Sequence, residues 1–146
     1  GADVLYGGEG DDTLAIVSTA FQRVAGGNGA DTLRLDGSGL TLDLTTTADN
    51  TVTDIEVVDI TGSGANTLTL DFLEVINISS TSNTLRVLAD GDDTVNIGAG
   101  WAFTDPACMG QSAPITTTAM DAPAIPFTLG DKCLPTFIEC TDSEPC

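Results

Sequence analysis

The chain of 146 residues contains no histidine, and Lys132 is its only lysine. These absences exclude Ser-His-Asp and Cys-His catalysis, histidine metal sites and most lysine chemistry, so carboxylates are the only plausible catalytic acids or bases. Basic residues are scarce altogether, because 4 Lys+Arg stand against 22 Asp+Glu, a formal net charge of -18. Nucleic acid and anionic membranes would repel such a chain, whereas cations would be attracted. The alternative is an acidic secreted protein whose charge only keeps it dispersed.

Long apolar runs are also missing. No stretch approaches the roughly 20 apolar residues of a membrane helix, so we expect no membrane insertion. No signal peptide is visible, and the chain begins at Gly1 inside a repeat and without Met. We therefore expect a fragment or a processed product whose targeting information lies elsewhere.

Cysteine and proline are absent from the first 102 residues, because all four cysteines and all six prolines follow Trp101. This change of composition divides the chain into two regions, residues 1–101 and residues 102–146. The first region holds sixteen acidic residues and three arginines. We expect a tail of different character after the boundary.

The first region repeats one short pattern, Gly-x-Asp/Asn-Thr-Leu/Val. Copies begin at Gly1, Gly10, Gly29, Gly64 and Gly91, and looser copies without the glycine begin at Ala48 and Thr81. Their spacing clusters around a half-turn of about nine and a full turn of about 18 residues, as in repeat architectures. Each coil of such a structure buries its apolar row only against its neighbours.

Apolar residues at every second position follow these copies, which indicates short strands with one buried face. The segments are Leu33–Leu35, Leu40–Leu44, Leu68–Leu70, Leu85–Val87 and Val95–Ile97. Turn-forming Gly, Asn, Asp and Ser lie between them. The sequence therefore predicts an all-β fold, a parallel β-solenoid of the β-roll or β-helix type. An antiparallel sandwich is the main alternative.

Two copies are longer, and both fit Gly-Gly-x-Gly-x-Asp-x-apolar, the calcium-binding nonapeptide of parallel β-helices. They are GGEGDDTL (residues 7–14) and GGNGADTL (residues 26–33). Calcium takes six to eight oxygen ligands, and one turn supplies only half of them, so two turns a full coil apart would enclose the ion. The predicted metal ligands are the carboxylates of Asp12 and Asp31 with backbone oxygens of Gly7, Glu9, Gly26 and Asn28. The alternative is a pair of tight turns without an ion.

Other copies carry a weaker calcium pattern. Asn66 and Asn83 take the place of the aspartate, and we expect asparagine hydrogen bonds to hold those turns. Asp90 and Asp93 are candidates for a second calcium site, although Ala89-Asp90 replaces the Gly-Gly pair.

Residues 1–101 resemble the C-terminal region of bacterial secreted RTX-type proteins, including large surface adhesins. The resemblance rests on the two nonapeptides and on phrases such as DGSGLTLDL, DIEVVDITGSGANTLTLD, ISSTSNTLRV and GDDTVNIGAGW. It implies type I secretion, an extracellular or cell-surface location, and folding in extracellular calcium. It also implies a non-catalytic role in adhesion or secretion, with calcium and cell-surface or matrix glycans as partners.

The tail, residues 102–146, departs from this family, which puts its role as an ordinary secretion signal in doubt. Its four cysteines, at positions Cys108, Cys133, Cys140 and Cys146, do not have zinc-site spacing and predict two disulfides of open connectivity. We expect a loop-rich, disulfide-stapled cap that docks Ala124–Phe127 and Leu134–Ile138 on the last coil. A foreign tail without an evolved role is the alternative.

Three further functions are alternatives to a calcium-stabilised adhesive module. A self-assembling extracellular fibre would stack through the open coil ends. A polysaccharide-cleaving β-helix would use Asp54, Glu56 and Asp59, although Val52–Ile60 has the pattern of an ordinary amphipathic strand. An ice-binding face would use the outward pairs Thr51/Thr53 and Thr67/Thr69. We expect a protein that is not an enzyme.

Overall fold

The computed structural model describes residues 2–97, 101–103, 116–118, 126–129 and 132–140, with side chains described for residues 2–97. These residues are mostly β-strand, with one short helix and one 3-10 turn. The elements are β1 (Asp3–Glu9), β2 (Thr13–Ile16), β3 (Phe21–Asn28), β4 (Thr32–Leu35), β5 (Thr41–Asp43), η1 (Leu44–Thr46), β6 (Val52–Thr53), β7 (Val57–Asp59), β8 (Thr67–Leu70), α1 (Phe72–Ile78), β9 (Arg86–Ala89), β10 (Thr94–Ile97), β11 (Trp101–Phe103), β12 (Thr116–Thr118), β13 (Pro126–Leu129) and β14 (Lys132–Cys140). The prediction of a β protein is confirmed in this coarse sense.

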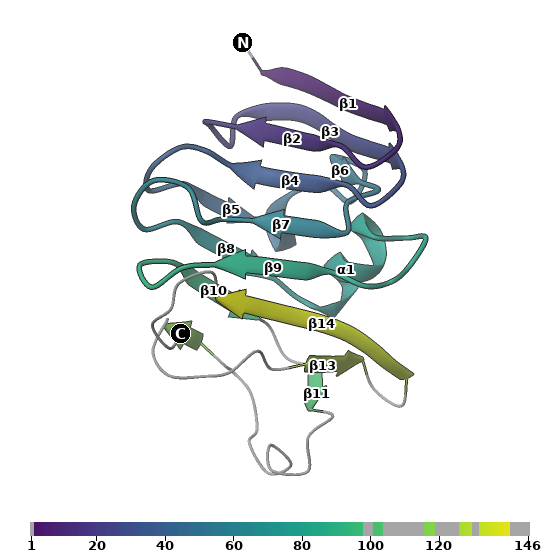
Figure 1. Ribbon diagram of the computed structural model, residues 1–146, viewed down its shortest axis with the longest axis vertical. Coiled ribbons are helices and arrows are strands. Elements are labelled where there is room, and N and C mark those ends of the chain that lie inside the picture. Colours follow the sequence, from purple (N-terminus) through teal and green to yellow (C-terminus); the bar gives the residue numbers. More distant parts are fainter. Residues whose placement is uncertain (1, 98–100, 104–115, 119–125, 130–131, 141–146) are drawn as a thin grey trace.

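The strands form three separate sheets that are parallel through residue 97 (Figure 1). Sheet A has the order β1-β3-β6, sheet B has the order β11-β13-β14-β9-β7-β4-β2, and sheet C has the order β12-β10-β8-β5. Between residues 21 and 70 the chain visits the sheets in the order A, B, C and then A, B, C again. We call these passages circuits: circuit 1 (residues 3–20), circuit 2 (21–51), circuit 3 (52–71) and circuit 4 (72–97). The joins between sheets A and B form the AB corner, and those between sheets B and C form the BC corner.

The spacing between neighbouring circuits is regular only at the start. Thr13 pairs with Thr32 and Gly8 with Gly27, and hydrogen bonds between these circuits join residues 19 positions apart. Between later circuits the equivalent bonds span 25, 26 and 27 positions. The expected full turn of about 18 residues therefore agrees with the spacing between circuits 1 and 2 and is wrong for the later ones. Circuit 1 has strands in sheets A and B alone, whereas circuits 2 and 3 add a strand of sheet C.

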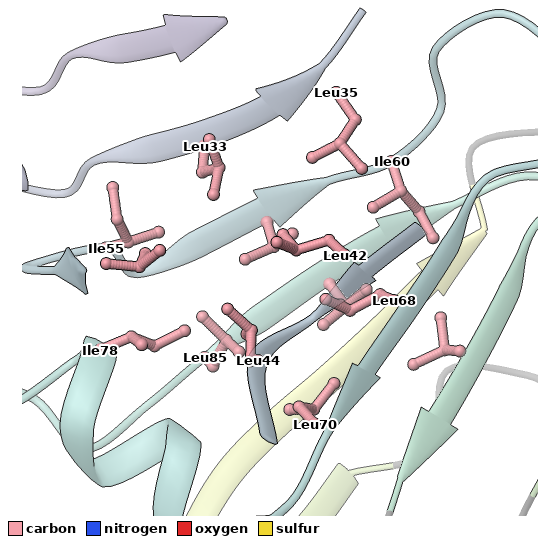
Figure 2. Packing of buried hydrophobic residues seen from close by; sticks show 14 of the residues in the cluster. Leu33, Leu35, Leu42, Leu44, Ile55, Ile60, Leu68, Leu70, Ile78 and Leu85 are labelled. Carbon is pink, nitrogen blue, oxygen red and sulfur yellow. The ribbon is translucent and has the colours of Figure 1, made fainter. Parts of the chain in front are cut away.

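The core lies between the sheets and is made by the alternating apolar residues (Figure 2). Leu33, Leu42 and Leu68 come from three strands, are fully or almost fully buried, and point toward one another in that view. The partners around them are Leu35, Leu44, Ile55, Ile60, Leu70, Ile78 and Leu85. Every segment in which the sequence predicts alternation contains a strand. Truncating one such leucine to alanine typically costs about 2–5 kcal/mol.

Helix α1 was not predicted. Its N-cap is Asp71, whose carboxylate accepts hydrogen bonds from the N–H groups of Leu73 and Glu74, and its C-cap is Ser79. An aspartate followed three residues later by glutamate is a helix-start signal that the strand pattern concealed. The helix begins circuit 4, at the point where circuits 2 and 3 have a strand of sheet A, and Ile78 O accepts a bond from Ile55 N–H of circuit 3.

The described residues of the tail supply strands to the same sheets, and the loop-rich character of the tail stays a prediction. Strand β14 pairs in parallel with β9, with Ile138 opposite Val87, and β12 pairs antiparallel with β10. The expected docking of Leu134–Ile138 on the last circuit agrees with this pairing. Cys108 and Cys146 lie outside the described residues, as do the side chains of Cys133 and Cys140, so the disulfides stay a prediction. In the described part of the chain, no helix has the length and apolar character needed to span a membrane.

Candidate metal centre at the AB corner

The two nonapeptides lie side by side, as the sequence predicts. Strands β1 and β3 pair with Gly8 opposite Gly27 and Glu9 opposite Asn28. The motifs are not pure turns, however, because Gly7–Glu9 and Gly26–Asn28 are the last residues of these strands. Only residues 10–12 and 29–31 turn the corner.

Glycine at these positions allows the circuits to approach each other closely. A Cβ on Gly7 would collide with the carbonyl oxygen of Gly26, and one on Gly26 would collide with the carbonyl oxygen of Asp54. Gly27 has a φ of 111°, in the left-handed region that favours glycine, and its Cβ would collide with Gly8. The repeated glycines are therefore explained by contacts between circuits, with or without an ion.

The predicted aspartates form the first rungs of a hydrogen-bond ladder. The N–H of Asp12 donates to Oδ1 of Asp31 at 2.8 Å, and the N–H of Asp31 donates to Oε2 of Glu56 at 2.9 Å. Backbone bonds run beside it, because Thr32 N–H donates to the carbonyl of Asp12. We call Asp12, Asp31 and Glu56 the acid ladder. Glu56 was not predicted as a member, since its surroundings, Asp54-Ile55-Glu56-Val57, lack the Gly-x-Asp-Thr-Leu pattern.

Each predicted aspartate of the acid ladder keeps one oxygen without a partner. Asp31 is fully buried, and its Oδ2 has no hydrogen-bond partner. Oδ2 of Asp12 is buried and unpartnered as well. Each atom lies close to a glycine of its own circuit, Oδ2 of Asp31 to Gly26 and Oδ2 of Asp12 to Gly7. A buried carboxylate oxygen without a donor is costly, so a cation at this corner would stabilise it.

The predicted carbonyl ligands lie in the same neighbourhood. The carbonyl of Asn28 accepts the N–H of Gly10 at 2.7 Å, and Nδ2 of Asn28 donates to Oε1 of Glu9 at 2.9 Å. Oδ1 of Asp11 accepts the N–H of Ala30. The nonapeptides are therefore joined along their whole length. Among the described residues, no group of three or more His, Cys, Asp or Glu side chains could hold a metal ion by itself. Backbone oxygens would have to complete any site here.

The BC corner carries a second ladder with different chemistry. Leu40 N–H donates to Oδ1 of Asn66, and Asn66 N–H donates to Oδ1 of Asp93, both at 2.9 Å. We call Leu40, Asn66 and Asp93 the amide ladder. Nδ2 of Asn66 donates to the carbonyl of Ile60, so the predicted asparagine bonding at this turn is confirmed. Asn83 lies at a φ of 50°, and its backbone N–H donates to Ser79.

The suggested second calcium site meets a different arrangement. Both carboxylate oxygens of Asp93 are occupied, Oδ1 by Asn66 N–H and Oδ2 by Asp90 N–H. Oδ1 of Asp90 accepts the N–H of Asp92. Burial raises the pKa of Asp93 to about 6, although both backbone bonds lower it. Asp93 thus has a structural role in the amide ladder, and calcium at Asp90 and Asp93 stays a prediction.

The residues named for the polysaccharide-cleaving and ice-binding alternatives do not come together as those functions would require. The chain turns at Asp54, which has a φ of 56°, so Val52–Ile60 contains two strands of different sheets, and the expectation of one amphipathic strand is wrong. Oδ1 of Asp59 is occupied by Thr61. Of the threonine pairs, Thr67 lies in register with Thr41 and Thr94 on sheet C, whereas Thr53 belongs to sheet A.

Comparison of the chain with protein-family models, with curated proteins and with solved structures gave no match.

Proposed function

We propose that residues 3–97 form a calcium-stabilised β-solenoid that serves as a non-catalytic structural or adhesive module of a secreted bacterial surface protein. The observation that carries the proposal is the acid ladder, with its unpartnered oxygens of Asp12 and Asp31 beside closely packed glycines. The resemblance of the nonapeptides to RTX-type repeats supports the same ion and an extracellular location. Glycans of a cell surface or matrix are the proposed adhesion partners.

The solenoid part of the proposal rests on strand order and register. In circuits 2 and 3 the strands pass from sheet A to sheet B to sheet C, and neighbouring circuits pair in parallel where both have a strand in the same sheet. A repeat of this kind stabilises each circuit through its neighbours. Nuclear Overhauser effects between the backbones of Leu33 and Val58 would test it, because these residues are partners in register. Their absence would count against the solenoid.

The residues present fit calcium. Calcium prefers hard oxygen ligands, and the corner offers the carboxylates of Asp12 and Asp31 with nearby backbone oxygens of Gly7, Glu9, Gly26 and Asn28. Bound calcium would offset the repulsion between stacked carboxylates. Because an ion that binds only the folded state stabilises it, about 2.7 kcal/mol is expected at a calcium concentration of 100 times Kd.

The test is thermal unfolding of the full chain followed by circular dichroism during a calcium titration. We expect the melting temperature to rise with calcium and to respond less to magnesium, which demands a stricter geometry. The double variant Asp12→Asn with Asp31→Asn should need more calcium for the same stabilisation. Asp3→Asn, which removes an exposed carboxylate at the start of β1 and outside both suggested calcium sites, is the matched control. An unchanged titration curve for the double variant would overturn the assigned site.

Self-assembly is a second candidate, favoured by the exposed edge strands of the described residues. Strands β1 and β2 are the outermost strands of sheets A and B. A Cβ on Gly8 or Gly10 would meet open space, whereas the equivalent Gly27 and Gly29 are covered by circuit 1. Such an exposed edge can pair with another strand. Sedimentation velocity at increasing protein and calcium concentrations should show larger species; a monomer throughout would remove this candidate.

A further inference from the structure

Glu56 occupies the position of the ladder aspartate in circuit 3. Oε2 of Glu56 accepts the N–H of Asp31, and the N–H of Glu56 donates to the carbonyl of Asp31 at 3.0 Å. Asp12 and Asp31 have the same relation one circuit earlier, because Asp12 N–H donates to the Asp31 carboxylate. The acid ladder thus extends through three circuits, one more than the two nonapeptides indicate.

The third rung is reached by a shorter path. Ala25 is paired with Thr53, so Gly26 lies opposite Asp54, and a Cβ on Gly26 would collide with the Asp54 carbonyl. From Asp54 the chain reaches Glu56 through Ile55 alone, whereas circuit 2 continues through Gly27–Ala30 before Asp31. The additional methylene of glutamate, compared with aspartate, makes up part of the missing length. The left-handed φ of Asp54 serves the turn where the earlier corners use glycine.

The ladder places three carboxylates in line on neighbouring strands, which lie about 4.8 Å apart. The hydrogen bonds described for these carboxylates come from backbone N–H groups, which are neutral. Asp31 is the middle rung; it is fully buried, and its Oδ2 has no partner. Its carboxylate is therefore flanked by acidic side chains on both sides, an arrangement that a bound cation would stabilise.

We propose that Asp31 and Glu56, with the carbonyl oxygen of Asp54, bind a second calcium ion between circuits 2 and 3. This inference rests on the proposed calcium site of Asp12 and Asp31, to which it adds a neighbouring site. Asp31 then contributes to both ions, one on each side of its rung. The chemistry favours a hard divalent cation, because every available ligand is an oxygen.

The test counts calcium ions bound to the full chain by native mass spectrometry, with isothermal titration calorimetry as the second readout. Glu56→Gln should lose one calcium ion and keep the other, and Asp12→Asn should do the same. Asp31→Asn should lose both. In the Glu56→Gln variant the amide oxygen of the new side chain would still accept the Asp31 N–H, so the fold is expected to survive, and circular dichroism checks this. Glu74→Gln is the control that removes a carboxylate from another place.

The outcomes separate the two proposals. If the unmodified protein binds no calcium at millimolar concentration, the proposed function fails and this inference fails with it. If the unmodified protein binds calcium and Glu56→Gln binds the same number of ions with the same affinity, only the second site is overturned. If Glu56→Gln loses one ion and keeps the other while Glu74→Gln loses none, the second site is supported.

Discussion

The AB and BC corners use the same hydrogen bond and differ in charge. In both, a backbone N–H of one circuit donates to a side-chain oxygen of the next. The acid ladder at the AB corner has carboxylates on all three rungs. The amide ladder at the BC corner consists of Leu40, Asn66 and Asp93. Asp93 carries its only carboxylate, and the neutral amide of Asn66 lies between Asp93 and Leu40.

The difference shows what each corner still needs. Asn66 uses both ends of its amide, and Asp93 uses both oxygens, so the amide ladder is satisfied by the protein alone. In the acid ladder Asp12 and Asp31 each keep a buried oxygen without a partner. An amide completes this backbone geometry at the BC corner, and we propose that a cation completes it at the AB corner.

The largest effect is expected from Gly26→Ala, because the AB corner needs close contact between circuits whether or not an ion is bound. The new Cβ would collide with the Asp54 carbonyl and with Asp31, so circuits 2 and 3 must separate. We expect a loss of at least about 3 kcal/mol in unfolding free energy, at the upper end of overpacking effects. Denaturant unfolding at saturating calcium measures it.

Gly91→Ala is the matched control for that substitution. Its Cβ would meet open space, and its φ lies outside the left-handed region, so a change within about 1 kcal/mol is expected. Equal losses for the two variants would show that close packing of the AB corner does not explain its glycines.

A reciprocal exchange of charge between the corners should give the next largest effect. Asn66→Asp removes the donor to the Ile60 carbonyl and buries a carboxylate, which should cost about 2 kcal/mol that calcium does not restore. Asp31→Asn keeps an acceptor for Asp12 N–H and removes the middle charge of the acid ladder. It should therefore raise the melting temperature in a chelator and reduce the gain from calcium.

Thermal unfolding of both variants, with calcium and with chelator, measures this exchange. The comparison between the corners fails if Asp31→Asn lowers stability in chelator as much as Asn66→Asp does. In that case the charge of the ladder would not matter, and only its hydrogen bonds would.

The sequence predicted the strands well because alternation is a local property. Leu33, Leu42 and Leu68 could be assigned to the core from their neighbours, and all three are buried. The lengths of circuits 2 to 4 could not be predicted, because extra residues in the loops leave no periodic signal. Helix α1 was missed because strand alternation on both sides outweighed a short segment whose helix-start signal is Asp71 with Glu74.

Part of the candidate metal site was also predicted from a local sequence pattern. Two full nonapeptides made Asp12 and Asp31 recognisable, and the register places them on neighbouring rungs. Glu56 lacked every motif residue around it, and only the pairing of β4 with β7 brings it beside Asp31. Contacts of this kind depend on loop length, which the sequence pattern does not specify. Asp54 was the one available signal for a turn before Glu56, since aspartate tolerates the left-handed region better than most residues.

The smallest of these effects concerns pH. Burial, and after it the neighbouring charges of Asp71, Asp49 and Asp43, raise the pKa of Glu74 to about 7. Because the pKa of Glu74 lies above its ordinary value, folding favours the protonated form. The stabilisation is fully present below the ordinary pKa near 4.5 and is lost as pH rises through about 7. Asp93 of the amide ladder has the same sign, with its loss centred near pH 6.

In calcium-free buffer the melting temperature should therefore rise as pH falls from about 8 to about 5. Glu74→Gln should raise it at pH 8, by an amount equivalent to about 1–2 kcal/mol, and should flatten the profile. Acid should thus strengthen α1 and the amide ladder. A melting temperature that falls with acid in chelator would contradict this prediction.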